Sequence, residues 1–88
     1  MAAVISGVVR GQNGQPVANA RIGFANAPVP VPDIAALTDD HGTFTLFAPA
    51  PGKYVIGCYA DGYAPANVAV DIVGSEPARI EIGLEQSH

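Results

Sequence analysis

Much of the chemistry that this sequence could perform is concentrated in one seven-residue stretch. Residues 38–44 read Thr-Asp-Asp-His-Gly-Thr-Phe and place two carboxylates beside an imidazole, in a chain of 88 residues that has eight acidic residues and two histidines. Calcium takes about six to eight oxygen ligands. One interpretation is therefore a calcium site made by Asp39, Asp40, His41 and, across a loop, Asp33, with backbone carbonyls and water completing the shell.

The same stretch also has the composition of a tight turn, and we favour this second interpretation. A three-residue hairpin loop is a type I turn followed by a residue in the left-handed region, where Gly42 carries no steric penalty because it lacks a Cβ. An aspartate at the first turn position accepts from the backbone N–H two residues on, and Asp39 holds that position. Asp40 and His41 then point into water, and the strand resumes at Phe44.

Other reactive side chains are isolated in the sequence. Cys58 is the single cysteine, which excludes an internal disulfide and a zinc site built from paired cysteines. It alternates with Ile56 and Ala60, so we predict a small buried hydrophobe, with a reactive or intermolecular thiol as the alternative. The serines and histidines lack the spacing of a nucleophile elbow. We therefore predict no catalytic residue, no metal site and no cofactor.

Charge and hydropathy exclude further classes. The formal net charge is −4, and the four basic residues stand singly at Arg10, Arg21, Lys53 and Arg79. A nucleic-acid binder must neutralise many phosphates, so we predict no nucleic-acid partner. No apolar run approaches the roughly 20 residues of a membrane helix, and no basic start followed by an apolar run marks a secretion signal. We expect a cytoplasmic protein without a membrane partner, or one exported by a route without a cleavable signal.

The elements that position these residues have the pattern of short strands. Apolar residues alternate with others in windows such as 44–46, 54–58 and 80–84, and a period of two is the signature of a half-buried strand. Turn pairs that contain glycine separate the windows, and no window of a dozen residues carries a helical pattern. Strands are predicted at 4–10, 18–26, 35–38, 43–48, 53–60, 66–73 and 78–84.

Strands with one apolar face bury it between two sheets, so we expect one sandwich domain over residues 1–88. Chains divide into domains only above roughly 150 residues. The predicted fold class is all-β, an antiparallel Greek-key β-sandwich of six to seven strands with an immunoglobulin-like architecture. The side chains predicted to face inward are Ile5, Gly7, Val9, Val17, Ala20, Ile22, Phe24, Leu37, Phe44, Leu46, Tyr54, Ile56, Cys58, Val68, Val70, Ile72, Ile80, Ile82 and Leu84.

The most unusual segment lies between the second and third predicted strands. Residues 27–33, Ala-Pro-Val-Pro-Val-Pro-Asp, have proline at every second position, which fixes φ and removes three backbone donors. We favour a rigid connector between the sheets. The alternative is a partner-binding loop, in which apolar side chains stand on a preordered backbone and binding costs less entropy. The candidate binding residues are Pro28, Val29, Pro30, Val31, Pro32 and Tyr59.

Several motifs together resemble a known family. They are Ile-Ser-Gly-Val-Val-Arg at 5–10, Gly-Gln-Pro-Val-Ala-Asn-Ala-Arg-Ile at 14–22, Thr-Asp-Asp-His-Gly-Thr-Phe-Thr-Leu at 38–46, Pro-Gly-Lys-Tyr-Val-Ile at 51–56 and Asp-Gly-Tyr at 61–63. Over residues 5–84 the chain resembles the carboxypeptidase regulatory-like domain, a small β-sandwich of the transthyretin-like (prealbumin-like) group. The resemblance implies an accessory part of a larger secreted or surface protein, or a free-standing adaptor.

Relatives of this group that carry out chemistry differ from the chain at their functional residues. Transthyretin-related hydroxyisourate hydrolases use histidines and an arginine and end in Tyr-Arg-Gly-Ser, whereas this chain ends Leu-Glu-Gln-Ser-His and has histidine only at 41 and 88. Intradiol dioxygenases bind iron through two tyrosines and two histidines, but Tyr54 and Tyr63 fall on structural positions of the resemblance. Collagen-adhesin repeats form an internal Lys–Asn bond, and we predict none here because residues 3–10 contain no Lys.

These observations favour a non-catalytic structural or protein-interaction module, an adaptor or accessory domain with a protein partner. The alternative is a module for a small molecule or carbohydrate, which normally needs an exposed aromatic platform or an apolar pocket. An enzyme of the transthyretin-related type comes last. Because Val8, Val55 and Tyr59 are apolar at outward positions, we expect a monomer or a weak homodimer formed through edge strands.

Overall fold

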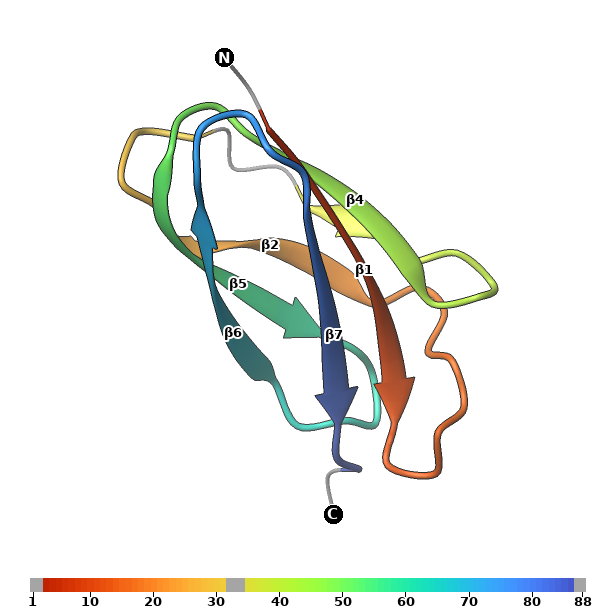
Figure 1. Ribbon diagram of the computed structural model, residues 1–88. Helices are drawn as coiled ribbons and strands as arrows, with labels where there is room; N and C mark the ends of the chain where they lie inside the picture. The colour runs from red at the N-terminus through yellow and green to blue at the C-terminus, as the bar shows by residue number, and fades with distance from the viewer. Residues whose placement is uncertain (1–2, 32–34, 87–88) are drawn as a thin grey trace.

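A computed structural model describes residues 3–31 and 35–86 as two packed β-sheets (Figure 1). Within these residues each of the predicted strands is present, and the prediction of an all-β sandwich is confirmed. None of the described residues belongs to a helix long and apolar enough to cross a membrane. The strands are β1 (Ala3–Gly11), β2 (Arg21–Asn26), β3 (Ala36–Leu37), β4 (Thr43–Ala48), β5 (Gly52–Tyr59), β6 (Ala66–Ile72) and β7 (Ala78–Leu84).

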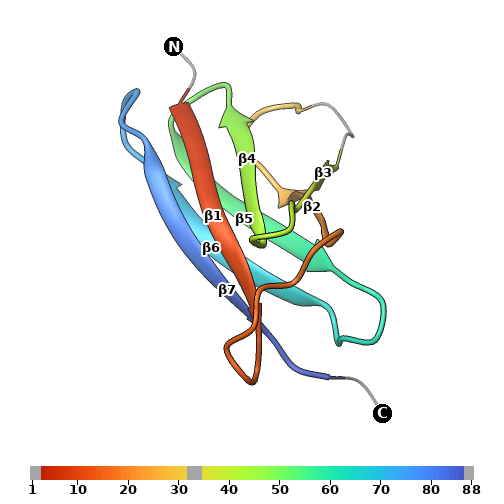
Figure 2. The ribbon, with the colours of Figure 1, turned by 90° about the vertical axis from the view of Figure 1, so that its right-hand side faces the viewer.

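The strands divide into a three-stranded sheet A, in the order β4-β1-β7, and a four-stranded sheet B, in the order β3-β2-β5-β6. Sheet A crosses in front of sheet B in Figure 2. Neighbouring strands are antiparallel as predicted, except that β1 and β7 run parallel. The exception arises because β7 enters sheet A by a crossover from β6 in the other sheet, so no hairpin reverses its direction relative to β1.

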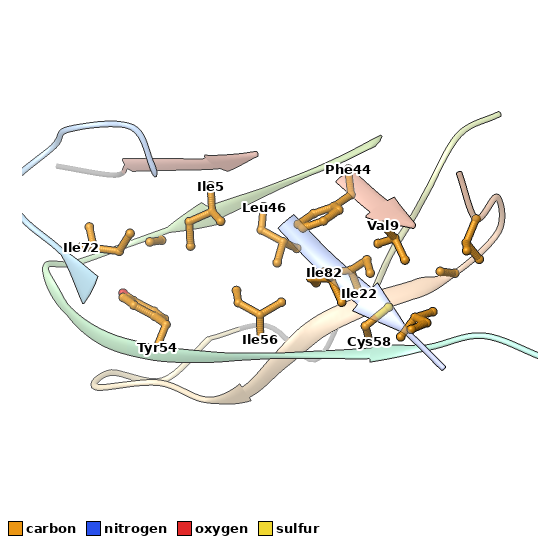
Figure 3. Close-up of a cluster of buried hydrophobic side chains, with 14 of the residues drawn as sticks. Ile5, Val9, Ile22, Phe44, Leu46, Tyr54, Ile56, Cys58, Ile72 and Ile82 are labelled. Atoms are coloured by element: carbon orange, nitrogen blue, oxygen red, sulfur yellow. The ribbon is translucent and has the colours of Figure 1, made fainter. Parts of the chain in front are cut away.

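The core lies between the two sheets. Figure 3 shows Tyr54, Ile56 and Cys58 pointing from β5 toward side chains of sheet A, such as Ile5 and Leu46. The fully or nearly buried hydrophobic residues are Ala3, Ile5, Val9, Val17, Ala20, Ile22, Phe44, Leu46, Ala48, Tyr54, Ile56, Cys58, Ile72, Ile82 and Leu84. Most of the predicted inward set is therefore buried, and Phe24, Val68, Val70 and Ile80 are half-buried against the core.

Leu37 is the clear error in the predicted core, since its side chain is 62% exposed. Thr38 takes the inward position instead and is 3% exposed. Its hydroxyl donates to Val17 O (2.7 Å) and accepts from Ala20 N (2.9 Å), while its backbone N–H donates to Ala20 O (3.0 Å). These bonds fix Thr38 inward, and the alternation of a strand then directs Leu37 outward. A hydrophobicity pattern predicts the reverse because it ignores the hydroxyl.

The second strand begins later than predicted, at Arg21 instead of residue 18. Asn19 has a positive φ of 61°, a left-handed conformation that asparagine tolerates better than most residues and that no strand contains. Its N–H donates to Thr38 O (3.0 Å). The turn at Asn19 and the residue that directly follows β3 therefore hold each other in place.

Candidate protein-interaction site

The turn at 38–44 is a closed hydrogen-bond network centred on Asp39. Asp39 Oδ1 accepts from His41 N and Thr43 N, both at 2.9 Å, and Oδ2 accepts from Thr43 Oγ1 at 2.5 Å. Gly42 N donates to Asp39 O (2.9 Å), and Gly42 has a φ of +75°. The predicted turn is confirmed, because both carboxylate oxygens satisfy groups of the turn itself.

One part of the turn prediction is wrong. The turn is no hairpin within a sheet, since it links β3 of sheet B to β4 of sheet A. Asp40 and His41 are exposed, as predicted. Asp33 lies outside the described residues, and among residues 3–31 and 35–86 no three His, Cys, Asp or Glu side chains gather in a way that could hold a metal ion. The calcium interpretation therefore gains no support from the described part of the chain.

The bonds to Asp39 predict a pH-dependent stability. The hydroxyl of Thr43, followed by its backbone N–H, lowers the pKa of Asp39 below its ordinary value of 3.8. Because the folded pKa is depressed, the stabilisation is complete above about 3.8 and disappears as the pH falls through the lower folded value. We expect Asp39→Asn to destabilise the domain at pH 7 and to have much less effect at pH 2.5, measured by urea unfolding at both pH values.

Asp40→Asn is the matched control for this prediction. Asp40 is the exposed neighbour, and its carboxylate accepts no hydrogen bond from the described residues. Its amide variant should unfold like the wild type at both pH values. Equal losses for Asp39→Asn at pH 7 and pH 2.5 would show that the charge of Asp39 contributes nothing.

Two other side chains that could take part in chemistry are buried in the core. Cys58 is fully buried, and burial raises the pKa of its thiol to about 11, so the thiolate that acts as a nucleophile is scarce at neutral pH. Tyr54 is also fully buried and its hydroxyl donates to Ala50 O (2.6 Å), which fastens the turn between β4 and β5. Its ring packs against Phe24 with centroids 5.2 Å apart. Both residues are structural here.

The structure separates the predicted partner-binding residues. Pro28 and Pro30 are exposed, Val29 is half-buried, and Val31 packs against the core. Pro28 contacts the first residue of β5, because a Cβ on Gly52 would lie 2.7 Å from Pro28 Cγ. Pro32 lies outside the described residues. The segment joins β2 to β3 within sheet B, so the expected connector between the two sheets is wrong. Tyr59 ends the same strand, about 23 Å away for an eight-residue strand, so it does not extend the loop surface.

Tyr59 lies instead in an exposed row across the outer face of sheet B. Arg21 on β2 pairs with Leu37 on β3 and with Tyr59 on β5, so the three side chains stand side by side. Strands in a sheet are about 4.8 Å apart, which gives the row a width of about 10 Å. Leu37 is 62% and Tyr59 is 49% exposed, and Arg21 is exposed between them. We call these three residues the Arg21 row.

Glycines beside the row fix the orientation of the tyrosine. Gly57 is covered by Asn67 and Tyr59. Asn67 Oδ1 would lie 3.3 Å from a Cβ on that glycine, and the Cε2 and hydroxyl atoms of Tyr59 would lie 3.4 and 3.6 Å from it. Gly23 pairs with Gly57 and has open space above it, with no atom within 4 Å of an added Cβ. The aromatic ring therefore lies on a flat floor next to an unfilled surface. Tyrosine and arginine are residue types enriched among the residues that dominate binding energy at interfaces.

The sequence indicated one member of this row and missed the other two. Tyr59 was predicted as a candidate, but Leu37 was assigned to the core and Arg21 appeared only as an isolated charge. Their juxtaposition depends on which strands pair and in which register, and a local pattern does not contain that information. The buried Thr38 was the available signal, because an inward Thr38 requires an outward Leu37.

A second surface feature is a polar hollow at the end of the sandwich where β1 and β7 finish. It is lined by Gln12, Asn13, Tyr63 and Gln86 and has a volume of about 80 Å³. Gln86 N donates to Gln12 Oε1 (3.2 Å) across it. Pockets for small molecules usually measure about 300 to 1,000 Å³. This hollow is too small to support the alternative prediction of a small-molecule or carbohydrate module.

Comparison with known proteins decides the family. The family model described as the carboxypeptidase regulatory-like domain matches residues 4–85, almost the whole chain. The chain belongs to this family. The predicted resemblance is thereby confirmed. The matched range includes every residue of the described strands except Ala3, the first residue of β1. A search of curated proteins found no match.

Solved structures of several different kinds of protein share the fold of this chain. This carboxypeptidase regulatory-like domain is similar to BcpA, the major pilin subunit of Bacillus cereus (TM-score 0.81, 14% identity, 99% of this chain and 30% of that one). It is also similar to a chain in a type II cohesin–X–dockerin complex from Acetivibrio cellulolyticus (0.70, 16%, 96% and 58%). A third is 3-chlorocatechol 1,2-dioxygenase from Rhodococcus opacus 1CP (0.73, 13%, 99% and 60%).

These three likenesses concern the fold alone. The domain spans between 30% and 60% of the length of these neighbours, and sequence identity is at most 16% among them. One neighbour is a pilin, one belongs to a protein complex and one is an enzyme. A fold shared by such different proteins does not identify an activity.

Proposed function

We infer that this carboxypeptidase regulatory-like domain is a non-catalytic protein-interaction module that binds a protein partner through the Arg21 row. The observation that carries the proposal is the in-register placement of Leu37, Arg21 and Tyr59 on an exposed sheet face. An aliphatic and an aromatic side chain on either side of a guanidinium suit a partner surface that offers an apolar pocket and a carboxylate.

The flat surroundings of the row support a protein partner over a small molecule. Gly23 has open space above it beside the covered Gly57, so a second protein surface can lie on this part of the sheet face. Tyr59 is already placed over Gly57, so little side-chain entropy is lost when a partner covers it. A small ligand needs a concave site instead.

The groups that could perform chemistry support the non-catalytic part of the proposal. Asp39 holds its turn, Tyr54 holds Ala50, and the Cys58 thiol is buried with a raised pKa. A nucleophile needs access to substrate, and Tyr54 and Cys58 are fully buried. Both carboxylate oxygens of Asp39 are occupied by donors of its own turn. The likeness to a chain of the cohesin–X–dockerin complex supports the protein-interaction part of the proposal. The cytoplasmic location stays a prediction.

Cross-linking in an extract of the native cell, followed by titration of the captured partner, tests the proposal. We expect Tyr59→Ala and Leu37→Ala each to weaken binding by about 30-fold, as residues worth about 2 kcal/mol at an interface do. Val73→Ala is the matched control, because Val73 is 68% exposed and lies outside the row, after β6. Val29→Asp probes the proline loop, and selective loss of binding in that variant would move the site there.

Turnover would contradict the proposal in a different way. If purified domain converts hydroxyisourate or a catechol, and Tyr59→Ala leaves that conversion unchanged, the chain is an enzyme and the Arg21 row is incidental. If the partner binds every row variant as tightly as the wild type, the module remains but the row is the wrong surface.

A further inference from the structure

β4 is one of the two edge strands of sheet A (Figure 1). Its open edge lacks the features that keep the other sheet edges from pairing with a strand of another chain. Natural sheets protect their edges by shortening them, by adding charges or by bulges. β3 has two residues, β6 carries Asp71, and β7 carries Arg79 and Glu81. β4 reads Thr-Phe-Thr-Leu-Phe-Ala, with no charge and no proline, and its pairing with β1 runs without a shift in register.

The register shows which backbone groups of β4 are free. Val9 N donates to Gly42 O (2.8 Å), so every second residue from Gly42 onward, including Phe44 and Leu46, directs its N–H and C=O toward β1. Thr43, Thr45 and Phe47 direct theirs to the open edge. Thr43 is occupied, because its N–H donates to Asp39 Oδ1 and its O accepts from Asp39 N (3.1 Å). Among the described residues, no hydrogen bond reaches the edge groups of Thr45 and Phe47.

We propose that β4 pairs antiparallel with β4 of a second copy of this chain, about a two-fold axis at Leu46. In this register Thr45 of one copy lies opposite Phe47 of the other, and each such pair exchanges both of its N–H to C=O bonds. The two pairs use all four free backbone groups of each copy, which are the N–H and C=O groups of Thr45 and Phe47. Thr43 takes no part in the pairing, because its edge groups already bond to Asp39. The result is a continuous six-stranded sheet with the order β7-β1-β4-β4-β1-β7.

The side chains and charges around the edge favour a second copy as the occupant. Phe47 is 65% exposed and pairs with Val4, which is 38% exposed, so apolar surface borders the free groups. Asp39 and Asp40 precede β4, whereas Lys53 follows it. Antiparallel pairing places the acidic end of one copy beside the end of the other that carries Lys53, whose register partner on β6 is Asp71, so this contact offsets only part of the repulsion between two acidic chains. A second copy is favoured because the free groups of the edge are self-complementary about a two-fold axis. The pairing uses backbone groups of Thr45 and Phe47 and none of the three side chains of the Arg21 row, so the inference stands or falls independently of the proposed function.

Amide hydrogen exchange by NMR, together with sedimentation, tests the register directly. Between about 0.01 and 1 mM protein, we expect a monomer–dimer equilibrium and at least about tenfold slower exchange at Thr45 and Phe47, since their N–H groups become bonded. Phe44 and Leu46 already bond to β1 and should show little change. Phe47→Lys should abolish dimerisation, because natural edges use lysine to block pairing. Val73→Lys, on the crossover to β7, should dimerise like the wild type.

Thr45→Pro is the backbone-specific variant, since it removes an edge donor and leaves the bonds to β1 intact. If it fails to fold, Phe47→Lys still decides. A constant monomer mass up to 1 mM overturns the inference, and so does protection of Thr45 and Phe47 in dilute monomer, which would mean that the chain covers its own edge. Concentration-dependent protection on β6 or β7 instead would assign the dimer to another edge.

Discussion

Replacing Phe44 by Ala should unfold most of the protein at room temperature or leave it close to unfolding. Phe44 is 4% exposed and faces Gly7 across the β1–β4 pair, where its ring atoms would lie 2.6 and 2.8 Å from a Cβ on that glycine. The ring thus fills the space that the glycine leaves, and no neighbour can collapse into the cavity without moving a strand. Such substitutions cost about 3 to 5 kcal/mol, a large fraction of the stability of a small domain.

Phe47→Ala supplies the matched control in the same strand. Phe47 is 65% exposed on the opposite face, so its truncation should change the unfolding free energy by no more than about 0.5 kcal/mol. Urea unfolding followed by circular dichroism, in dilute protein, measures both variants. Similar losses at the two positions would mean that the face assignment of β4 is wrong.

Gly42→Ala should have the second-largest effect, for two separate reasons. The left-handed φ of +75° costs an alanine about 1 to 2 kcal/mol. A Cβ there would also lie 2.5 Å from Val9 O and 3.2 Å from Val17 N, which are backbone atoms in contact with each other through a hydrogen bond of 2.9 Å. Because backbone must shift to relieve the overlap, we expect a total loss of about 2 to 5 kcal/mol.

Gly62→Ala separates the two causes of this loss. Gly62 has a similar φ of +86° but has no atom within 4 Å of an added Cβ. It should therefore show only the backbone cost, about 1 to 2 kcal/mol. Thermal or urea unfolding measures the loss of unfolding free energy in both variants. The difference between the two losses is the cost of the overlap with Val9 on β1. Equal losses would mean that the turn moves to accommodate the methyl group without disturbing Val9.

The local elements were predictable from the sequence because their causes are local. Alternating apolar residues predicted the strands, and the glycine turns predicted where most of them end. The Asp39 turn was predictable for the same reason, since its bonds join residues at most four positions apart. Asn19 shows the limit, because nothing in its neighbours indicates that its N–H will bond to Thr38.

The candidate interaction site was only partly predictable. Tyr59 was expected to extend the proline loop, yet it lies at the far end of β5 from Pro28 and joins Arg21 and Leu37 instead. These residues are 16 and 22 positions apart in sequence. A strand pattern gives the face on which each side chain stands, but it does not say which strand lies alongside.

The sequence alone determined that this chain is a sandwich of short strands with an acidic turn, because alternation and turn chemistry act within a few residues. Only the tertiary structure decided that β7 runs parallel to β1, that Leu37 is exposed, and that β4 is left with a free edge. Each of these follows from the pairing of strands distant in sequence, where register and buried hydrogen bonds such as those of Thr38 outweigh local hydrophobicity.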